Sequence, residues 1–306
     1  MEKEKIWDIY TEEYAAKYND TFLLEPYSKV SADQEVKIIK ELIDADTEWL
    51  DIACGTGYFL SQFPGVKRAG YDLSPGMLKE AQKVNPDALF FKQGDFRIDV
   101  PEWENKWSLT SCMWGAYAYV ESLAEVELLV ANMVKWTAAG GTILIPTVDL
   151  EDLRLVNIPY EVPNPVYGGS TIINSCVWTW VEEDTSKVHV QIGPQVDHFV
   201  KLLQPYFETV EIVYYPPFQD GWSSKKSVIA KNKLSDKDPS HRAKVIRHPF
   251  PENSYQALQR GYVGSTSDIP NSLLIAELLG RIKNGYIPKS ILNRLLQKIN
   301  RKWYIK

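Results

Sequence analysis

The stretch WLDIACGTGYFL, residues 49–60, places tight limits on the fold of this chain. An apolar run that ends in Asp51 meets a turn holding Gly55 and Gly57, and a second apolar stretch follows. A buried strand that enters a helix through such a turn is typical of α/β proteins. Because glycine has no side chain, the backbone of the turn can approach a ligand and adopt positive φ angles. Purely structural turns also contain glycine pairs, so the surroundings of this pair decide its meaning.

Strands and helices alternate along the first half of the chain. The apolar pattern predicts helices near 4–19 and 30–44, followed by strands at 48–53, 67–71, 88–92, 107–113 and 141–147 and helices at 56–63, 75–84 and 122–137. Such alternation implies right-handed crossovers and a mostly parallel sheet with helices on both faces. Ligands of these sheets bind beyond the carboxyl ends of the strands, where we therefore expect the functional residues.

The pattern changes after residue 147. Two runs, 170–184 and 186–193, are typical of an antiparallel hairpin, and they are followed by a helix at 195–207 and strands at 209–215 and 226–232. We expect a doubly wound, mostly parallel, seven-stranded Rossmann-like sheet. An antiparallel hairpin is inserted after its fifth strand, and the C-terminal tail is helical.

The domain organisation is expected to change at a polar stretch, residues 233–244. Residues 1–235 form the main domain, in which 1–45 are a helical lid and 160–195 a hairpin insertion on the substrate side. Residues 236–306 form a basic, partly helical extension. Within it, residues 241–306 contain 12 Lys or Arg and 3 Asp or Glu, whereas residues 1–240 contain 22 and 37.

This charge distribution restricts the partners. An acidic body argues against wide contact with nucleic-acid phosphates. The basic tail could contact an anionic membrane surface, bind a partner protein, or cap its own domain. No apolar run approaches the ~20 residues of a membrane-spanning helix, and the charged N-terminus does not resemble a secretory signal. We expect a cytoplasmic protein, with a peripheral position at the inner face of the membrane as an option.

The three cysteines, Cys54, Cys112 and Cys176, are an odd number and show no CxxC spacing. Neither a disulfide framework nor a metal site is predicted from them.

Acidic residues recur at successive strand ends. Asp72 follows Asp51 by 21 residues and ends the second predicted strand, and Asp95 follows the third. A carboxylate at the position of Asp72 can accept hydrogen bonds from both hydroxyls of a ribose. Asp95 could accept a hydrogen bond from an exocyclic amine. Each acid alone is more often a helix cap or a solvated loop residue, but their recurrence favours a nucleoside site.

At this point the sequence resembles the class I S-adenosylmethionine-dependent methyltransferases. DIACGTG, YDLSPGML and GDF are similar to the first three motifs of that family, in its order and roughly its spacing, over residues 45–150. The resemblance implies that S-adenosylmethionine is the cofactor, and that the early helix covers it. The residues implied in cofactor binding are Tyr14, Tyr18, Asp51, Ala53, Cys54, Gly55, Gly57, Asp72, Leu73, Met77, Gly94, Asp95, Phe96 and Trp114.

Methyl transfer is an in-line displacement, so the protein contributes alignment and, for a hydroxyl acceptor, a base. The candidate catalytic residues are His198, Tyr117 and Glu121. His189, on a predicted hairpin strand, is passed over in favour of His198. Candidate substrate residues are Tyr119, Asp149, Trp178 and Trp180, and the tryptophan pair could equally serve sheet packing or a homodimer contact.

We therefore expect a methyltransferase that acts on a hydroxyl, and less readily on an amine, of a sugar, glycan or other small metabolite. The motif [DN]PP[YF] of enzymes that methylate DNA bases is absent after the fourth strand. Two alternatives stay open. A nicotinamide-dependent oxidoreductase would share the fold, although the third glycine of GxGxxG is missing. A catalytically silent cofactor-binding partner would keep the acids without an acceptor site.

Overall fold

The structure is a computed structural model of the chain. It describes residues 9–148, 161–163, 170–172, 175–182, 186–235 and 240–257. Asp149, the start of the first predicted helix and the tail after residue 257 lie outside the described residues. The chain divides into two compact units, Met1–Gln256 and Ala257–Lys306.

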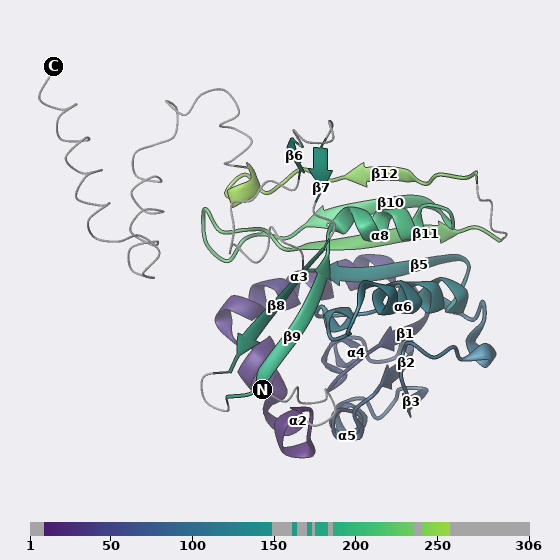
Figure 1. The fold of residues 1–306 in the computed structure, drawn as a ribbon. Coiled ribbons are helices and arrows are strands. Elements are labelled where there is room, and N and C mark those ends of the chain that lie inside the picture. The colour runs from purple at the N-terminus through teal and green to yellow at the C-terminus, as the bar shows by residue number, and fades with distance from the viewer. Residues whose placement is uncertain are drawn as a thin grey trace, which may run out of the picture. The chain divides into compact units, whose positions relative to one another are not determined.

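The first unit is built on one large sheet of eight strands, in the order β12-β10-β11-β5-β4-β1-β2-β3 (Figure 1). The strands are β1 (Glu48–Ile52), β2 (Lys67–Asp72), β3 (Phe90–Gln93), β4 (Trp107–Ser111), β5 (Thr137–Thr147), β10 (Phe207–Tyr214), β11 (Lys226–Lys233) and β12 (Lys244–Arg247). Only β11 runs antiparallel to its neighbours, β5 and β10. Because β1 pairs with both β2 and β4, the strand order reverses there. The predicted doubly wound, mostly parallel sheet is confirmed.

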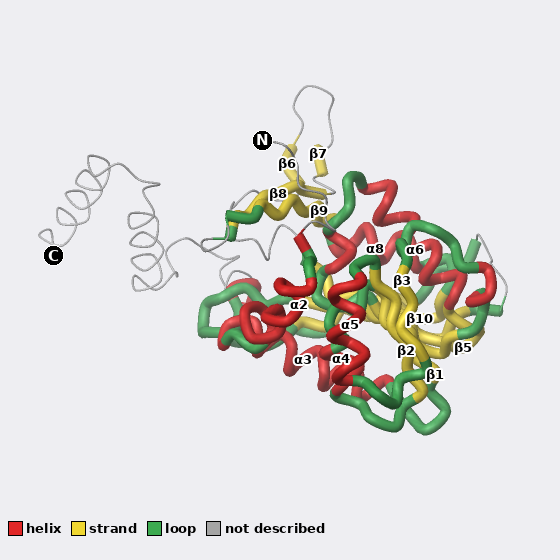
Figure 2. Tube along the Cα trace, turned by 90° about the horizontal axis from the view of Figure 1, so that it is seen from below, coloured by secondary structure: helices red, strands yellow, loops and turns green. Residues whose placement is uncertain are grey.

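Helices cover both faces of this sheet, as the view in Figure 2 shows. They are α2 (Glu12–Tyr18), α3 (Pro26–Leu42), α4 (Tyr58–Ser61), α5 (Pro75–Val84), α6 (Leu123–Trp136) and α8 (Val196–Leu203). Their starts follow from local chemistry. Ser74 caps α5 by accepting a hydrogen bond from the amide of Met77 at 3.1 Å, and Ser122 caps α6 in the same way.

The hydrophobic core forms two layers, one on each face of the sheet. One layer joins the apolar stripes of α6 and α8 to side chains such as Leu50 and Ile52 of β1. The other joins α3 and α4 to Trp49 of the same strand. Side chains alternate along a strand, so Asp51 shares the face of Trp49. It lies in the interior because residues 49–52 of this strand are all buried.

Two predictions differ from the structure. The sheet has eight strands and not seven, because Lys244–Arg247 pairs in parallel with β10 and extends the edge. The compact unit accordingly ends at Gln256, so the boundary expected at residue 235 lies about twenty residues too early. In the chain, this polar stretch joins β11 to β12, two strands of the same sheet.

The inserted hairpin is also more divided than expected. The run 170–184 contributes two short strands, β7 (Ser170–Ile172), which pairs with β6 (Glu161–Pro163), and β8 (Ser175–Val181), which pairs with β9 (Val188–Pro194). Within the β8–β9 hairpin, Trp180 lies opposite His189.

Within the part of the chain that the structure describes, no helix is long and apolar enough to cross a membrane. The contact expected between the basic tail and a membrane or a partner stays a prediction, as does a homodimer.

Candidate active site

A cavity of about 510 Å³ opens at the carboxyl ends of β1, β2 and β4. Its walls come from the turns after these strands, from the segment around α2, and from β9. Most of the residues predicted for the cofactor line it. They are Tyr18, Ala53, Cys54, Gly55, Asp72, Leu73, Met77, Asp95, Phe96 and Trp114.

Strained backbone gathers at this rim. Ala53 and Trp114 are non-glycine residues with positive φ angles, 54° and 58°, and both line the cavity. Gly55, between β1 and α4, has a φ of 54°, and a side chain added there would meet no atom within 4 Å. Such conformations are costly for residues other than glycine and collect at functional sites. The turn after β1 therefore presents bare backbone to the cavity.

Asp72 holds that turn in place. One carboxylate oxygen accepts a hydrogen bond from the amide of Gly55 at 2.8 Å, and the other accepts one from the amide of Ser74, also at 2.8 Å. Burial raises the pKa of Asp72, while these backbone donors oppose the rise. Each oxygen can accept a further hydrogen bond, so the carboxylate can serve a ligand while it fixes the turn.

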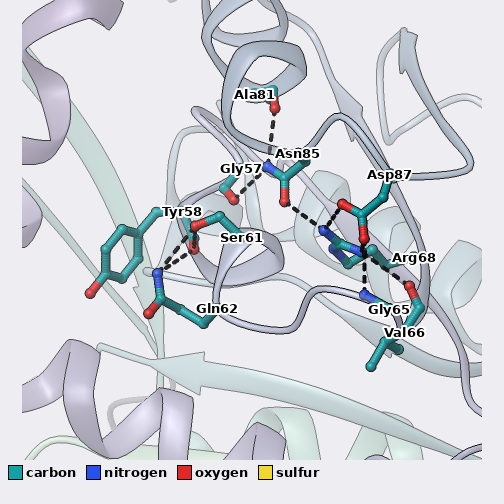
Figure 3. A network of polar contacts seen from close by, with 10 residues as sticks. All are labelled: Gly57, Tyr58, Ser61, Gln62, Gly65, Val66, Arg68, Ala81, Asn85 and Asp87. Atoms are coloured by element: carbon teal, nitrogen blue, oxygen red, sulfur yellow. Dashed lines mark hydrogen bonds and ion pairs between the residues drawn. The ribbon is translucent and has the colours of Figure 1, made fainter.

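Gly57 lies outside the cavity, in a polar network that supports the turn from behind (Figure 3). Its carbonyl accepts a hydrogen bond from the side-chain amide of Asn85 at 3.0 Å, which also donates to the carbonyl of Ala81 in α5. The guanidinium of Arg68, almost fully buried, contacts Asn85 and pairs with Asp87 at 2.6 Å. This ion pair holds the pKa of Asp87 far below its usual range. The network fastens α5 to the glycine turn.

Asp51 lies behind the cavity wall and is fully buried. One of its carboxylate oxygens accepts a hydrogen bond from the hydroxyl of Ser111 at 2.6 Å. The other has no hydrogen-bond partner among the described residues. Burial raises the pKa of Asp51 to about 8, and the nearby charge of Asp72 adds to the rise. A cation bound nearby would favour the ionised form of Asp51 and lower this pKa.

Asp95 lines the cavity and is paired with Arg97. The guanidinium approaches the carboxylate at 2.6 Å, and a second nitrogen reaches Glu125 at 3.0 Å. Burial acts to raise the pKa of Asp95, but the guanidinium and the backbone amide of Arg97 outweigh it and hold this pKa below its usual range. Sequence reasoning missed Arg97, although its position two residues after Asp95 was a usable signal.

Aromatic residues form the opposite wall, which joins the α2 segment to the β8–β9 hairpin. Tyr10, Tyr18, Tyr119 and His189 line the cavity. The ring of His189 stacks on Trp180 with centroids 3.9 Å apart and planes 4° from parallel. Tyr14 and Trp180 stand outside the lining and pack behind it.

The other predicted residues fall away from the cavity. Gly94 packs against the ring of Tyr71. Tyr117 is fully buried, and its hydroxyl accepts a hydrogen bond from the amide of Val148 at 2.8 Å. His198, on α8, approaches Glu127 at 3.1 Å. Trp178 packs against Gly193 within the hairpin.

Glu121 lines the cavity beside Tyr119. Among the described residues, no cluster of three or more His, Cys, Asp or Glu could hold a metal ion.

Comparison with known proteins gives a direct indication of the family. Residues 50–145 match the family model described as "Methyltransferase domain". A Streptomyces venezuelae dTDP-3-amino-3,4,6-trideoxy-alpha-D-glucopyranose N,N-dimethyltransferase is 32% identical over 100 residues, which cover 31% of this chain and 40% of that protein. A Saccharopolyspora spinosa dTDP-4-amino-2,3,4,6-tetradeoxy-D-glucose N,N-dimethyltransferase is 27% identical over 141 residues, 45% of this chain and 52% of that protein. The chain thus spans about half the length of these curated relatives.

Residues 50–145 thus match a methyltransferase domain, in agreement with the resemblance to the class I S-adenosylmethionine-dependent methyltransferases that the sequence motifs carry. Among solved structures, Streptomyces venezuelae DesVI is similar with a TM-score of 0.48 and 20% identity, covering 71% of this chain and 97% of that one.

The cofactor of such a domain is S-adenosylmethionine, and the cavity fits its chemistry. The cofactor carries an ammonium and a sulfonium, and buried acids beside a cavity favour cations. Asp72 lines the cavity and Asp51 is buried behind its wall. The apolar side chains of Leu73, Met77 and Phe96 line the same space and suit the faces of an adenine ring. A pyrophosphate group would be repelled by the same acids, which argues against a dinucleotide.

Sequence reasoning preferred His198 to His189, and only His189 reaches the cavity. The missing information was the hairpin register, which places His189 opposite Trp180. Register depends on the geometry of the turn between two strands, and the alternating pattern of the β9 sequence does not reveal which side faces the domain.

Proposed function

We propose that the chain is an S-adenosylmethionine-dependent methyltransferase that acts on an amine of a small sugar-like acceptor. The observation that carries this proposal is the shared cavity. One wall consists of the bare turn after β1 and the acid Asp72, and the other consists of polar aromatic residues, including Tyr119 and His189. Cofactor and acceptor can therefore lie against each other, which in-line methyl transfer requires.

The choice of nitrogen revises the order expected from the sequence, which placed a hydroxyl first. Both curated relatives named above are N,N-dimethyltransferases of dTDP-linked amino sugars. Their matches cover 31% and 45% of this chain, so they support the reaction type more directly than the identity of the sugar. A hydroxyl acceptor is therefore the second candidate, and it makes the stronger demand on a base.

Cofactor choice is tested by calorimetric titration with S-adenosylmethionine, S-adenosylhomocysteine and NAD. We expect binding of the first two and none of NAD. The Asp72→Asn variant keeps the shape of the side chain but loses its charge, so it should bind S-adenosylhomocysteine about 1.5 to 3 kcal/mol more weakly, which is ~10- to 150-fold. Asp33→Asn, at an exposed acid paired with Lys29, is the control and should leave binding unchanged. Preference for NAD would overturn the proposal.

Acceptor choice is tested with matched pairs of dTDP-linked deoxysugars that differ only in carrying an amino or a hydroxyl group at one carbon. Mass spectrometry should detect a gain of one or two methyl groups on the amino member and little on its hydroxyl partner. Methylation of the hydroxyl member alone would return the assignment to oxygen. Tight cofactor binding without turnover of any sugar would instead favour the catalytically silent partner.

A further inference from the structure

A chain of hydrogen bonds runs from the cavity into the β8–β9 hairpin. The hydroxyl of Tyr119 lies 3.2 Å from Nδ1 of His189, and Nε2 of the same ring lies 2.7 Å from the carboxylate of Glu182. Tyr119 and His189 both line the cavity, whereas Glu182 does not. The side chains of His189 and Glu182 are only 1% and 8% exposed, so water screens their interaction little.

Hydrogen-bonding chemistry fixes the direction of this chain. An ionised carboxylate can only accept, so Nε2 of His189 must carry the proton that points to Glu182. In the neutral ring Nδ1 is then an acceptor, and the hydroxyl of Tyr119 donates to it. This arrangement leaves the oxygen of Tyr119 able to accept a proton from a group in the cavity.

The surrounding contacts hold the ring of His189 in place. Trp180 stacks on one face of it, and the indole nitrogen of Trp180 donates to Gln191 at 3.1 Å. The hydroxyl of Tyr14 donates to the same carboxylate oxygen of Glu182 that His189 contacts. The ammonium group of Lys187 lies 3.9 Å from the centre of the Tyr14 ring. A ring with so little freedom is suited to directional proton transfer.

We propose that Tyr119 is the catalytic residue that receives the proton released by the methyl acceptor and that His189 and Glu182 are the positioning residues that take up this proton and stabilise it. The proposal rests on the proposed methyltransferase function and names the proton path of the same site.

The ammonium of the acceptor gives one proton to the oxygen of Tyr119, while Tyr119 gives its own proton to Nδ1 of His189. The freed lone pair attacks the methyl carbon, the bond between that carbon and sulfur breaks, and its electron pair stays on sulfur as a neutral thioether. The products are a methylated ammonium, S-adenosylhomocysteine and an imidazolium held by Glu182.

Several titratable groups face this relay. Tyr10 hydrogen-bonds Tyr119, and Tyr14, Tyr18 and Lys187 stand close by. Burial raises the pKa of Tyr119 to about 12, and the hydrogen bond from Tyr10 opposes that rise. Tyr119 is therefore neutral at pH 7 and can pass a proton on without first losing one.

The kinetic test uses His189→Gln, Tyr119→Phe and Glu182→Gln in the full chain, with a dTDP-linked amino sugar as acceptor. General acid–base catalysis contributes ~100-fold or more, so we expect His189→Gln and Tyr119→Phe to lower kcat about 100-fold at pH 7. The rate of each variant should keep rising with pH as the acceptor amine loses its proton to solvent. Affinity for S-adenosylhomocysteine should change less than about twofold, which separates the relay from cofactor binding and from folding.

Substitutions of two other histidines test whether the loss of activity is specific to His189. His248→Gln alters an exposed histidine that pairs with Glu211 at 2.9 Å and should leave kcat unchanged. His198→Gln tests the residue preferred from the sequence. Loss of activity in His198→Gln with normal kcat and pH profile in His189→Gln would overturn the relay.

A readout independent of turnover separates this inference from the proposed function. Nitrogen-15 NMR of the histidine rings should show His189 with the proton on Nε2, and Tyr119→Phe should shift its Nδ1 resonance. A proton on Nδ1 in the unaltered protein would overturn the relay even if methyl transfer is confirmed. Conversely, the expected tautomer without methyl transfer to any acceptor would reject the function and with it the proton step.

Discussion

The two walls of the cavity are assembled in different ways. One wall, which we call the cofactor wall, consists of the turn after β1 and Asp72. Its contacts are local in sequence, and Asp72 accepts a hydrogen bond from Gly55 across 17 residues. On the opposite wall Tyr119 contacts His189 across 70 residues, and Tyr14 contacts Glu182 across 168. The first wall is set by strand ends of one continuous sheet. The second is set by the docking of the α2 segment and the β8–β9 hairpin beside the turn after β4, which carries Tyr119.

This difference indicates which contacts make each wall of the cavity rigid. The cofactor wall is backed by the mostly buried strands β1 and β2 and by the network around Arg68 and Asn85 (Figure 3). The other wall is held by side-chain hydrogen bonds and ring contacts between α2 and the hairpin. We therefore expect substitutions on the cofactor wall to change the stability of the whole domain. Substitutions on the opposite wall should change mainly the coupling of its two segments.

The largest expected effect concerns the pH dependence of stability and Asp51. Its pKa is about 8 in the folded protein and about 4 when unfolded. Between these values the folded state retains a proton that the unfolded state has released, so the free energy of unfolding falls as pH rises. The fall is on the order of 5 kcal/mol from pH 4 to pH 8 for this group alone.

Asp51→Asn mimics the protonated acid and should remove that part of the slope, making the variant more stable than the unaltered protein at pH 8. Urea titrations at pH 5 and pH 8 measure the difference. Glu35 is a second buried acid whose pKa burial raises to about 8, and the charge of Asp51 adds to that rise. The difference between the two proteins therefore measures Asp51 together with its effect on Glu35. If the free energy of unfolding had the same pH dependence in the two proteins, folding would not raise the pKa of Asp51.

The cofactor wall was predictable because its information lies in one short stretch. An apolar strand, a glycine turn and acids at the next strand ends are all local patterns, and a parallel sheet brings them to one edge whatever the rest of the chain does. The specific role of each residue could not be predicted in this way. Asp51 and Gly57 belong to the motif but support the wall from behind, because strand alternation and the Asn85 contact turn them from the cavity.

The second prediction separates backbone strain from packing at the glycine turn. Gly57 has a φ of 68°, and a methyl group added there would lie 2.7 Å from the side-chain nitrogen of Asn85 and 3.0 Å from Cβ of Ala81. Gly65 has a φ of 87° with no atom within 4 Å of the same position. Gly57→Ala should cost about 3 kcal/mol of stability from strain and overpacking together, and Gly65→Ala about 1 to 2 kcal/mol from strain alone.

Thermal and urea unfolding of the two variants measure this difference directly. Equal losses would mean that Asn85 and α5 move aside readily, and the network around Arg68 would then not make the cofactor wall rigid. A larger loss at Gly57, together with weaker binding of S-adenosylhomocysteine, would show that the network transmits its rigidity to the turn.

The opposite wall could not be predicted from the sequence, for a physical reason. Its hydrogen bonds depend on hairpin register and on the docking of α2, and neither follows from a pattern within a single segment. The eighth strand was missed similarly, since four residues, Lys244–Arg247, carry little apolar signal and gain their place by pairing with β10. Of the residues predicted to contact substrate, Tyr119 lines the cavity, whereas Trp180 stacks on His189 from outside the lining. The sequence could not tell which histidine meets them.

The smallest expected effect tests the connection between α2 and the hairpin. Tyr14→Phe removes one hydrogen bond to the carboxylate of Glu182 and keeps the ring on which Lys187 rests. A hydrogen bond to a charged group contributes about 1.5 kcal/mol or more. A double-mutant cycle with Glu182→Gln measures the coupling itself, because it cancels the separate contact between Glu182 and His189. A coupling of about 1.5 kcal/mol in unfolding experiments is expected. A coupling near zero, with activity retained, would mean that the two segments dock through ring contacts such as Phe22 on Trp180 and that the hydrogen bond only orients Glu182.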